Sequence, residues 1–410
     1  MRWSRSWCGC LAPLLAGCGN ASSGGNGAPT DAIVGTDSGL DAGASLDGAS
    51  PMGDASPADT TPLPDTHVPS SCDGLPAKGT WEDVTPPGVD ESTFGVGTVV
   101  VDPNKTATVY LGTSKSGLFK SLDCGAHWVH VDTGTLGADL DKGSVGPLLD
   151  PVDSNVLYTG SLYGTNGLFK STNGGVDWTQ ILNGDVRKDA PYGGFVGHID
   201  MDPTDHLHLL VAWHAECATP HTKSCYGETK DGGASWAMRD GRPEWIGGEG
   251  AALQFLTSTT WLFSSSSNGM WRSTDSGLTW NQIPDAAVAH GSGQLFRSAK
   301  GAYFLGSANG VLYSADGATW SLVPGSGRLI QGVVGDDETV WASEAFPYNP
   351  PDRPTPFLPY HQASQSAPTT WTTLDSPKMT SGGATLAFDR DHRILYSANY
   401  WEGLRRVVVE

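Results

Sequence analysis

The sequence predicts an all-β fold built from many short strands and tight turns. Only 17% of the 410 residues are charged, whereas the chain holds 54 glycines, 27 prolines and 15 tryptophans. Glycine and proline are unfavourable inside helices, so this composition disfavours helical bundles and coiled coils. A turn-rich motif also recurs between residues 121 and 320, which divides this part of the chain into similar units.

The recurring motif is short and occurs five times. Each copy begins with Ser or Thr, continues with Asp or Asn and then Gly, and ends in Trp. The copies are Ser121–Trp128, Ser171–Trp178, Thr229–Trp236, Ser273–Trp280 and the one-residue-shorter Ser314–Trp320. The motif resembles the Asp-box, or BNR, repeat S-x-D-x-G-x-x-W of the sialidase and xyloglucanase-like superfamily.

The residue types in the motif are those of a tight turn. A carboxylate or amide can accept backbone N–H bonds across the turn, glycine adopts a positive φ, and tryptophan packs between neighbouring sheets. We therefore expect the Asp or Asn of each copy to be structural, and these residues are Asp123, Asn173, Asp231, Asp275 and Asp316.

Each repeat is long enough for four short strands, which is one blade of a β-propeller. Seven tryptophans mark the outer strands, namely Trp81, Trp128, Trp178, Trp236, Trp280, Trp320 and Trp371. The last repeat stops after Gly403–Val407 without such a strand, and Gly79–Val84 supplies it ahead of the first blade. We predict a seven-bladed β-propeller of four-stranded blades whose last blade is shared between the N- and C-termini. Six or eight blades are the alternatives.

Residues 1–17 have the pattern of a bacterial signal peptide. Two arginines precede the apolar stretch Trp7–Leu15, which is too short to span a bilayer. The sequence Leu15-Ala-Gly-Cys18 resembles the lipobox of bacterial lipoproteins, which implies that Cys18 carries the lipid. An ordinary signal peptide with an incidental cysteine is the alternative.

Residues 18–71 contain mainly Gly, Ala, Ser, Asp, Thr and Pro, with no Lys or Arg. Such a segment cannot bury enough apolar surface to order itself, so we predict a flexible tether. The propeller is then expected at residues 72–410, at the bacterial cell envelope, with the lipid as its only attachment to the outer membrane or cell surface.

Four cysteines remain in the expected propeller. An even number in an exported chain indicates two disulfides with three pairings to choose from. We predict the pairs Cys217–Cys225 and Cys72–Cys124, the second of which would pin the closing strand to the first blade. The alternative is a zinc site at metal-like spacings, with the ligands His214, Cys217, His221 and Cys225.

The long loops are expected to share one face of the propeller around the central channel. Loops longer than a turn requires often carry function. The catalytic candidates there are Asp141, Asp189, His214, Glu244, Glu249 and His290. The candidate binding residues are Arg187, Arg242, Trp245, Tyr348 and Trp401.

The superfamily resemblance implies no single activity, because its members bind as well as cleave glycans. The arginine motif of sialidases is absent, and Phe296-Arg-Ser-Ala299 is its nearest match. The xyloglucanase-like members usually carry a catalytic Asp where this chain has Thr113-Ser-Lys-Ser116. We therefore expect a propeller that binds a glycan or a surface protein. A glycoside hydrolase or polysaccharide lyase and a purely structural envelope protein are the alternatives.

The formal net charge is −20, which disfavours nucleic acid as a partner. We expect no cofactor and, apart from the alternative zinc site, no resident metal, and we expect a monomer.

Overall fold

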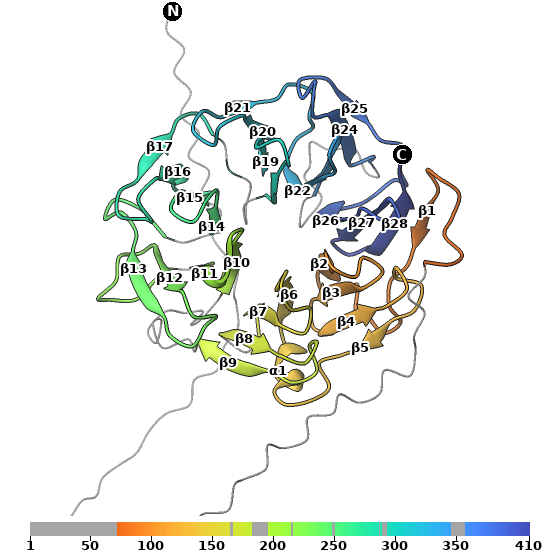
Figure 1. Cartoon of the computed structure of the whole chain (residues 1–410), viewed down its shortest axis with the longest axis horizontal. Helices are drawn as coiled ribbons and strands as arrows, with labels where there is room; N and C mark the ends of the chain where they lie inside the picture. Colours follow the sequence, from red (N-terminus) through yellow and green to blue (C-terminus); the bar gives the residue numbers. More distant parts are fainter. Residues whose placement is uncertain are drawn as a thin grey trace, which may run out of the picture. The chain divides into compact units, whose positions relative to one another are not determined.

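The computed structural model describes residues 72–410 apart from 165–166, 183–195, 215, 248–250, 287, 289–292 and 346–356. Seven four-stranded antiparallel sheets stand in a ring (Figure 1). This confirms the predicted seven-bladed β-propeller. The expected signal peptide, Cys18 and the tether lie outside the described residues. Among the described residues, no helix is long and apolar enough to cross a membrane.

Each sheet forms one blade, whose strands run in order from the centre of the ring outward (Figure 1). Blade 1 consists of β2 (Val96–Val101), β3 (Val109–Thr113), β4 (Leu118–Ser121) and β5 (Val129–His130). Blade 2 consists of β6 (Ser144–Leu149), β7 (Leu157–Leu162), β8 (Leu168–Ser171) and β9 (Thr179–Leu182). Blade 3 consists of β10 (Val196–Asp202), β11 (Asp205–Trp213), β12 (Cys225–Thr229) and β13 (Ala237–Asp240). Blade 4 consists of β14 (Ala252–Phe255), β15 (Trp261–Ser265), β16 (Gly269–Ser273) and β17 (Asn281–Ile283).

The remaining blades follow the same order. Blade 5 consists of β18 (Leu295–Arg297), β19 (Tyr303–Ser307), β20 (Gly310–Ser314) and β21 (Ser321–Leu322). Blade 6 consists of β22 (Ile330–Gly335), β23 (Thr339–Glu344), β24 (Tyr360–Ser364) and β25 (Trp371–Thr373). Blade 7 consists of β26 (Gly383–Asp389), β27 (Ile394–Asn399), β28 (Gly403–Val408) and β1 (Trp81–Asp83). The short helix α1 (Gly137–Leu140) lies between blades 1 and 2.

Blade 7 closes the ring with strands from both ends of the propeller. Strand β1 pairs antiparallel with β28, and Trp81 stands opposite Val407. The Trp81 ring lies 4.6 Å from that of Tyr360 in blade 6. Its indole N–H donates to the carbonyl of Asp375. The predicted sharing of the last blade is therefore confirmed.

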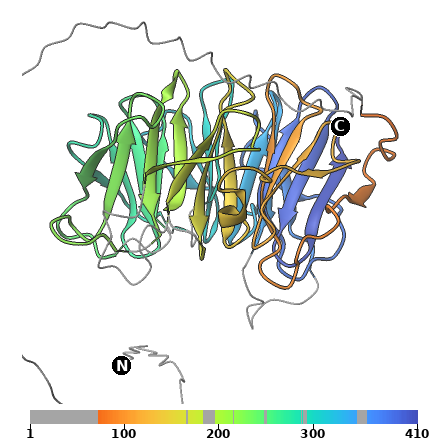
Figure 2. The same cartoon turned by 90° about the horizontal axis from the view of Figure 1, so that it is seen from below.

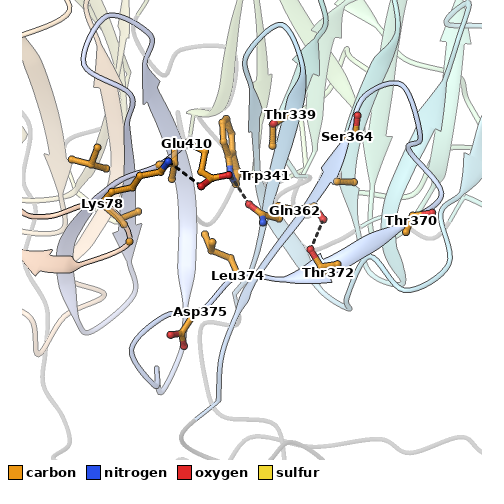
Figure 3. Close-up of a pocket in the computed structure, with 15 residues that line it drawn as sticks. Lys78, Thr339, Trp341, Gln362, Ser364, Thr370, Thr372, Leu374, Asp375 and Glu410 are labelled. Carbon is orange, nitrogen blue, oxygen red and sulfur yellow. Dashed lines mark hydrogen bonds and ion pairs between the residues drawn. The ribbon is translucent and has the colours of Figure 1, made fainter.

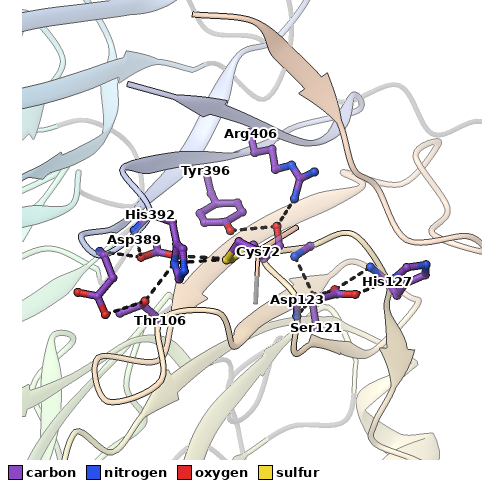
Figure 4. The surroundings of a disulfide bond; sticks show 12 residues. Cys72, Thr106, Ser121, Asp123, His127, Asp389, His392, Tyr396 and Arg406 are labelled. Carbon is purple, nitrogen blue, oxygen red and sulfur yellow. Dashed lines mark hydrogen bonds and ion pairs between the residues drawn. A yellow bond between two sulfur atoms is a disulfide. The ribbon is translucent and has the colours of Figure 1, made fainter. Parts of the chain in front are cut away.

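The disulfide Cys72–Cys124 joins the segment before β1 to the turn after β4 (Figure 4). The carbonyl of Cys124 also accepts hydrogen bonds from Tyr396 and Arg406, two residues of blade 7. Arg406 is buried and in turn donates to Glu82 of β1. Blade 1 is thus fastened to blade 7 by one covalent bond and a buried polar network.

The second predicted disulfide, Cys217–Cys225, is also present. It consumes both thiols of the alternative zinc site, so that alternative is wrong. His221 instead bonds to Asp240 through its Nδ1 atom.

The repeated motifs form tight turns between the third and fourth strands. In the third copy, Asp231 Oδ1 accepts from the backbone N–H of Ser235 at 2.9 Å. In the second copy, the amide oxygen of Asn173 accepts from Asp177 at the same distance. In the other three copies, equivalent backbone N–H bonds are accepted by Asp123, Asp275 and Asp316.

Because the strands of each blade are antiparallel, the connections between strands lie alternately on one face of the ring and on the other. Figure 2 shows the ring from the side, with its sheets standing next to one another. The turn face carries the connections from first to second and from third to fourth strands, including the repeated motifs. The long-loop face carries the connections from second to third strands and those between blades. Helix α1 and the segments 84–95, 214–224 and 374–382 belong to the long-loop face.

Removing residues 72–85 should leave β28 as an unpaired outer strand and eliminate the covalent pin. Because an exposed edge favours aggregation, we expect a melting temperature lower by many degrees, or aggregation, by differential scanning fluorimetry and light scattering. Removing residues 58–70 instead is the matched control. Equal stability of the two truncated chains would contradict the closure model.

Asp231→Ala should lower the melting temperature at pH 7, whereas Asp231→Asn should nearly preserve it, because Asn173 performs the same task in blade 2. Hydrogen bonds from Ser235 hold the pKa of Asp231 at about 2, below its ordinary 3.8. The depressed folded-state pKa means that its stabilisation is present above pH 3.8 and is lost as the pH falls toward 2. The difference in melting temperature between wild type and Asp231→Ala should therefore shrink as the pH falls from 3.8 toward 2. A pH-independent difference would count against this role.

Candidate functional site

Four aromatic side chains gather on the long-loop face where blades 7, 1 and 2 meet. Phe94 precedes β2, Tyr163 follows β7, and Tyr400 and Trp401 connect β27 to β28. The rings of Phe94 and Tyr163 are parallel within 8°, with centroids 6.0 Å apart. The Trp401 ring lies 5.0 Å from Phe94. We call these four residues the aromatic cluster.

The backbone beneath the aromatic cluster is tied together by hydrogen bonds. Trp401 N–H donates to the carbonyl of Phe94, and Ser114 N–H donates to that of Gly95. Ser114 also forms an isolated bridge with Ser144, the first residue of β6. Three blades therefore hold the cluster on one rigid support.

Three of the four aromatic residues have left-handed backbone conformations. The φ angles are 63° at Phe94, 58° at Tyr163 and 59° at Trp401. Left-handed φ is unfavourable for residues with a Cβ atom, and it concentrates at functional sites, where other requirements outweigh its cost. Tyr163 is also 56% exposed, so packing alone does not explain an aromatic residue there.

Tyr400 lies beside both neighbouring rings, with its ring centroid 6.1 Å from that of Phe94 and 6.0 Å from that of Trp401. Burial raises the pKa of its phenol to about 12, and the nearby Tyr163 acts in the same direction. The phenol is therefore neutral at physiological pH.

Asp141, a catalytic candidate, lies beside two residues that the sequence did not single out. Its Oδ1 atom is 3.2 Å from Nε2 of His130, and the same nitrogen is 2.8 Å from Oδ1 of Asp132. Burial raises the pKa of Asp132 to about 6, against the lowering effects of the Leu118 N–H and His130. This group lies near the aromatic cluster. Gly143, two residues after Asp141, packs against Gly164, which directly follows Tyr163.

The structure places Arg242, Glu244 and Trp245 together near the outer edge of blades 3 and 4. Arg242 pairs with Glu244, lies over the Trp271 ring and donates to the carbonyl of Trp280. Trp245 is 2% exposed and stacks on Phe263. Trp245 is therefore a core residue, and its ring is not presented to a ligand as we expected.

His214 lies at the end of β11 beside Gly197, next to the inner strand of blade 3. It belongs to blade 3, whereas the aromatic cluster is built from blades 7, 1 and 2. The candidates Asp189, Glu249, His290, Arg187 and Tyr348 lie outside the described residues. Of the predicted site residues that are described, Trp401 belongs to the aromatic cluster and Asp141 to the group beside it.

A groove of about 670 Å³ lies elsewhere, at the seam between blades 6 and 7 (Figure 3). Trp341 and Gln362 line it, and the ion pair between Lys78 and Glu410 spans 2.9 Å. This ion pair lowers the pKa of Glu410. The carboxylate of Glu410 is therefore ionised near neutral pH, which makes it a poor general acid.

The residues that sequence reasoning missed carry faint local signals. Phe94 and Tyr163 each precede a glycine in a connecting loop, where a large aromatic residue is not needed for the turn. His130 and Asp132 are two positions apart at the end of an outer strand. Neither pattern recurs in every blade, so counting repeats passes over both.

Comparisons with known proteins agree on the fold. No family model matches the sequence, and no curated protein matches it. Among solved structures, a catalytically inactive variant of virginiamycin B lyase from Staphylococcus aureus with quinupristin has a TM-score of 0.56 and 13% identity, and the match covers 81% of this chain and 99% of that one. YCF48 from Cyanidioschyzon merolae has a TM-score of 0.51 and 12% identity, over 80% and 98% of the two chains.

An ancestral GH74 enzyme is also similar, with a TM-score of 0.47 and 20% identity, over 69% of this chain. The match spans only 37% of that enzyme's length. The likenesses to virginiamycin B lyase and YCF48 agree with the propeller fold, and their low identities leave the activity to the site.

Tyr163→Gly should be more stable than Tyr163→Ala by about 1 kcal/mol, because glycine adopts positive φ without the Cβ penalty. Urea denaturation of both variants measures this difference. Equal stabilities would show that the left-handed backbone at this position is unstrained.

Proposed function

We propose that this protein is a lipid-anchored envelope propeller that binds a glycan at the aromatic cluster. The observation that supports this most is the aromatic cluster on left-handed backbone, in which Tyr163 is 56% exposed and Phe94 and Trp401 are partly buried beside it. Aromatic side chains combine a large apolar face with low conformational entropy, which suits them to ligand contact. The apolar C–H face of a sugar ring matches such a surface.

Polar groups around the cluster complete a carbohydrate-binding surface. Asp90 and Lys115 interact electrostatically beside Phe94, and Ser116 accepts a hydrogen bond from the Asp90 N–H. Glu402 follows Trp401 and receives N–H bonds from Thr380. Hydroxyl groups of a sugar find donors and acceptors there while its ring rests on the aromatic side chains.

The location of the protein at the cell envelope is also part of the proposal. Cys18 would carry the lipid and residues 18–71 would hold the propeller away from the membrane. The N-terminal motifs alone support this part.

A glycan-active enzyme is the second candidate, favoured by the raised pKa of Asp132 beside Asp141. A carboxyl with a pKa of about 6 suits a general acid. Asp132 itself is 1% exposed, so only Asp141, of the two carboxyls, could reach a substrate directly. This burial makes binding the better supported function.

The full chain should be titrated against a panel of polysaccharides by isothermal calorimetry. Tyr163→Ala and Trp401→Ala should each weaken binding of the positive polysaccharide by about 10-fold, as expected for aromatic anchors. Leu278→Ala is the matched control, because Leu278 is an exposed apolar residue on the turn face.

Release of new reducing ends, abolished by Asp141→Asn, would favour the enzyme instead. Unchanged affinity in both aromatic variants would contradict the proposed site.

A further inference from the structure

The group beside the aromatic cluster has the side chains of a metal site. His130 closes β5, Asp132 follows it by two residues, and Asp141 stands just after helix α1. One ligand atom from each of the three lies within 4.8 Å of the others. The Phe119 ring, 5.1 Å from the imidazole, packs beside His130 and holds its orientation.

One carboxylate oxygen of the buried Asp132 has no hydrogen-bond partner. The residue is 1% exposed, and its Oδ1 atom accepts from the Leu118 N–H at 3.1 Å. Its Oδ2 atom is buried and has no hydrogen-bond partner. A buried carboxylate oxygen without a partner is costly, so this atom points to a missing positive group.

Gly117 shows that both carboxylates converge on the same small space. A Cβ atom at this position would collide with Asp141 Oδ1 and with Asp132 Oδ2. Glycine therefore keeps clear the region into which both oxygens project. His130 Nε2 stands beside the same two carboxylates.

We propose that His130, Asp132 and Asp141 bind a divalent cation of the Zn²⁺ or Mn²⁺ type. The imidazole disfavours Ca²⁺ and Mg²⁺, which prefer oxygen ligands alone. A tetrahedral Zn²⁺ with bonds of about 2.0 Å places its ligand atoms about 3.3 Å apart. The separations of 2.8 and 3.2 Å from His130 Nε2 need only a small adjustment to reach this geometry.

The cation would also balance the negative charges of the two carboxylates. The carboxylates of the buried Asp132 and the partly exposed Asp141 converge on the same space. A divalent ion balances both charges and gives the orphaned Oδ2 atom a ligand bond. The half-exposed His130 and Asp141 leave the outer side of the ion open to water or another ligand.

Binding would fix the loop between blades 1 and 2. Lys115 N–H already donates to the carbonyl of Gly143, and Gly143 packs against Gly164. A cation joining His130 and Asp132 to Asp141 would therefore brace the support of Tyr163.

The full chain, with its disulfides oxidised, should first be treated with a chelator and dialysed. Titration with ZnCl₂ and MnCl₂ by calorimetry should give one site per chain. Asp132→Asn and His130→Gln should each weaken that site by about 100-fold or more, since even indirect ligand partners cost about 10- to 100-fold. Added Co²⁺ should show the visible absorption bands of a site with a nitrogen ligand, and these bands should be lost in His130→Gln.

Two variants serve as controls. Asp139→Asn alters a nearby carboxylate that pairs with Lys142 at 2.5 Å. His392→Gln alters the histidine beside the Cys72–Cys124 disulfide, where Asp389 offers another carboxylate. Both should bind the ion as the wild type does.

Thermal melts with chelator separate loss of binding from loss of fold, and Asp141→Asn provides a variant at the more exposed ligand. Absence of binding by the wild type, or equal binding by all ligand variants, would overturn the proposal.

Discussion

Ring closure is the constraint on which the remaining structure depends. Strand β1 stands more than 300 residues before its partner β28, and six complete blades lie between them in the sequence. The Cys72–Cys124 bond and the two hydrogen bonds to the Cys124 carbonyl hold this junction from the neighbouring blade. The aromatic cluster straddles the same junction, since Phe94 and Trp401 come from its two sides. Closure therefore builds the candidate site.

The two faces of the propeller divide stability from function. On the turn face, side-chain acceptors such as Asp231 satisfy backbone N–H groups, which leaves these residues committed to the fold. On the long-loop face, Tyr163 keeps an exposed ring on an unfavourable backbone, and Asp132 keeps a buried oxygen without a partner. Such local costs make sense where a ligand or an ion supplies the missing interaction.

The sequence predicted features that repeat and missed features that occur once. The recurring turns and the tryptophans led to seven blades, the shared last blade and both disulfides, because each rests on local chemistry or on counting. The candidate site depends on which loops of different blades become neighbours. Its place in a long loop predicted a ligand role for Trp245, yet the fold buries it against Phe263. No spacing relates Phe94 to Tyr163 or Trp401, since blade packing alone brings them together.

The most direct test of the account is hydrogen–deuterium exchange of the full chain with and without a bound polysaccharide. Slower exchange should be confined to residues 90–95, 114–117 and 400–403 and to the amides next to Tyr163. Exchange in the turns at 122–128 and 230–236 should stay unchanged. Protection of those turns, with none around Phe94 and Trp401, would contradict the assignment of binding to the long-loop face.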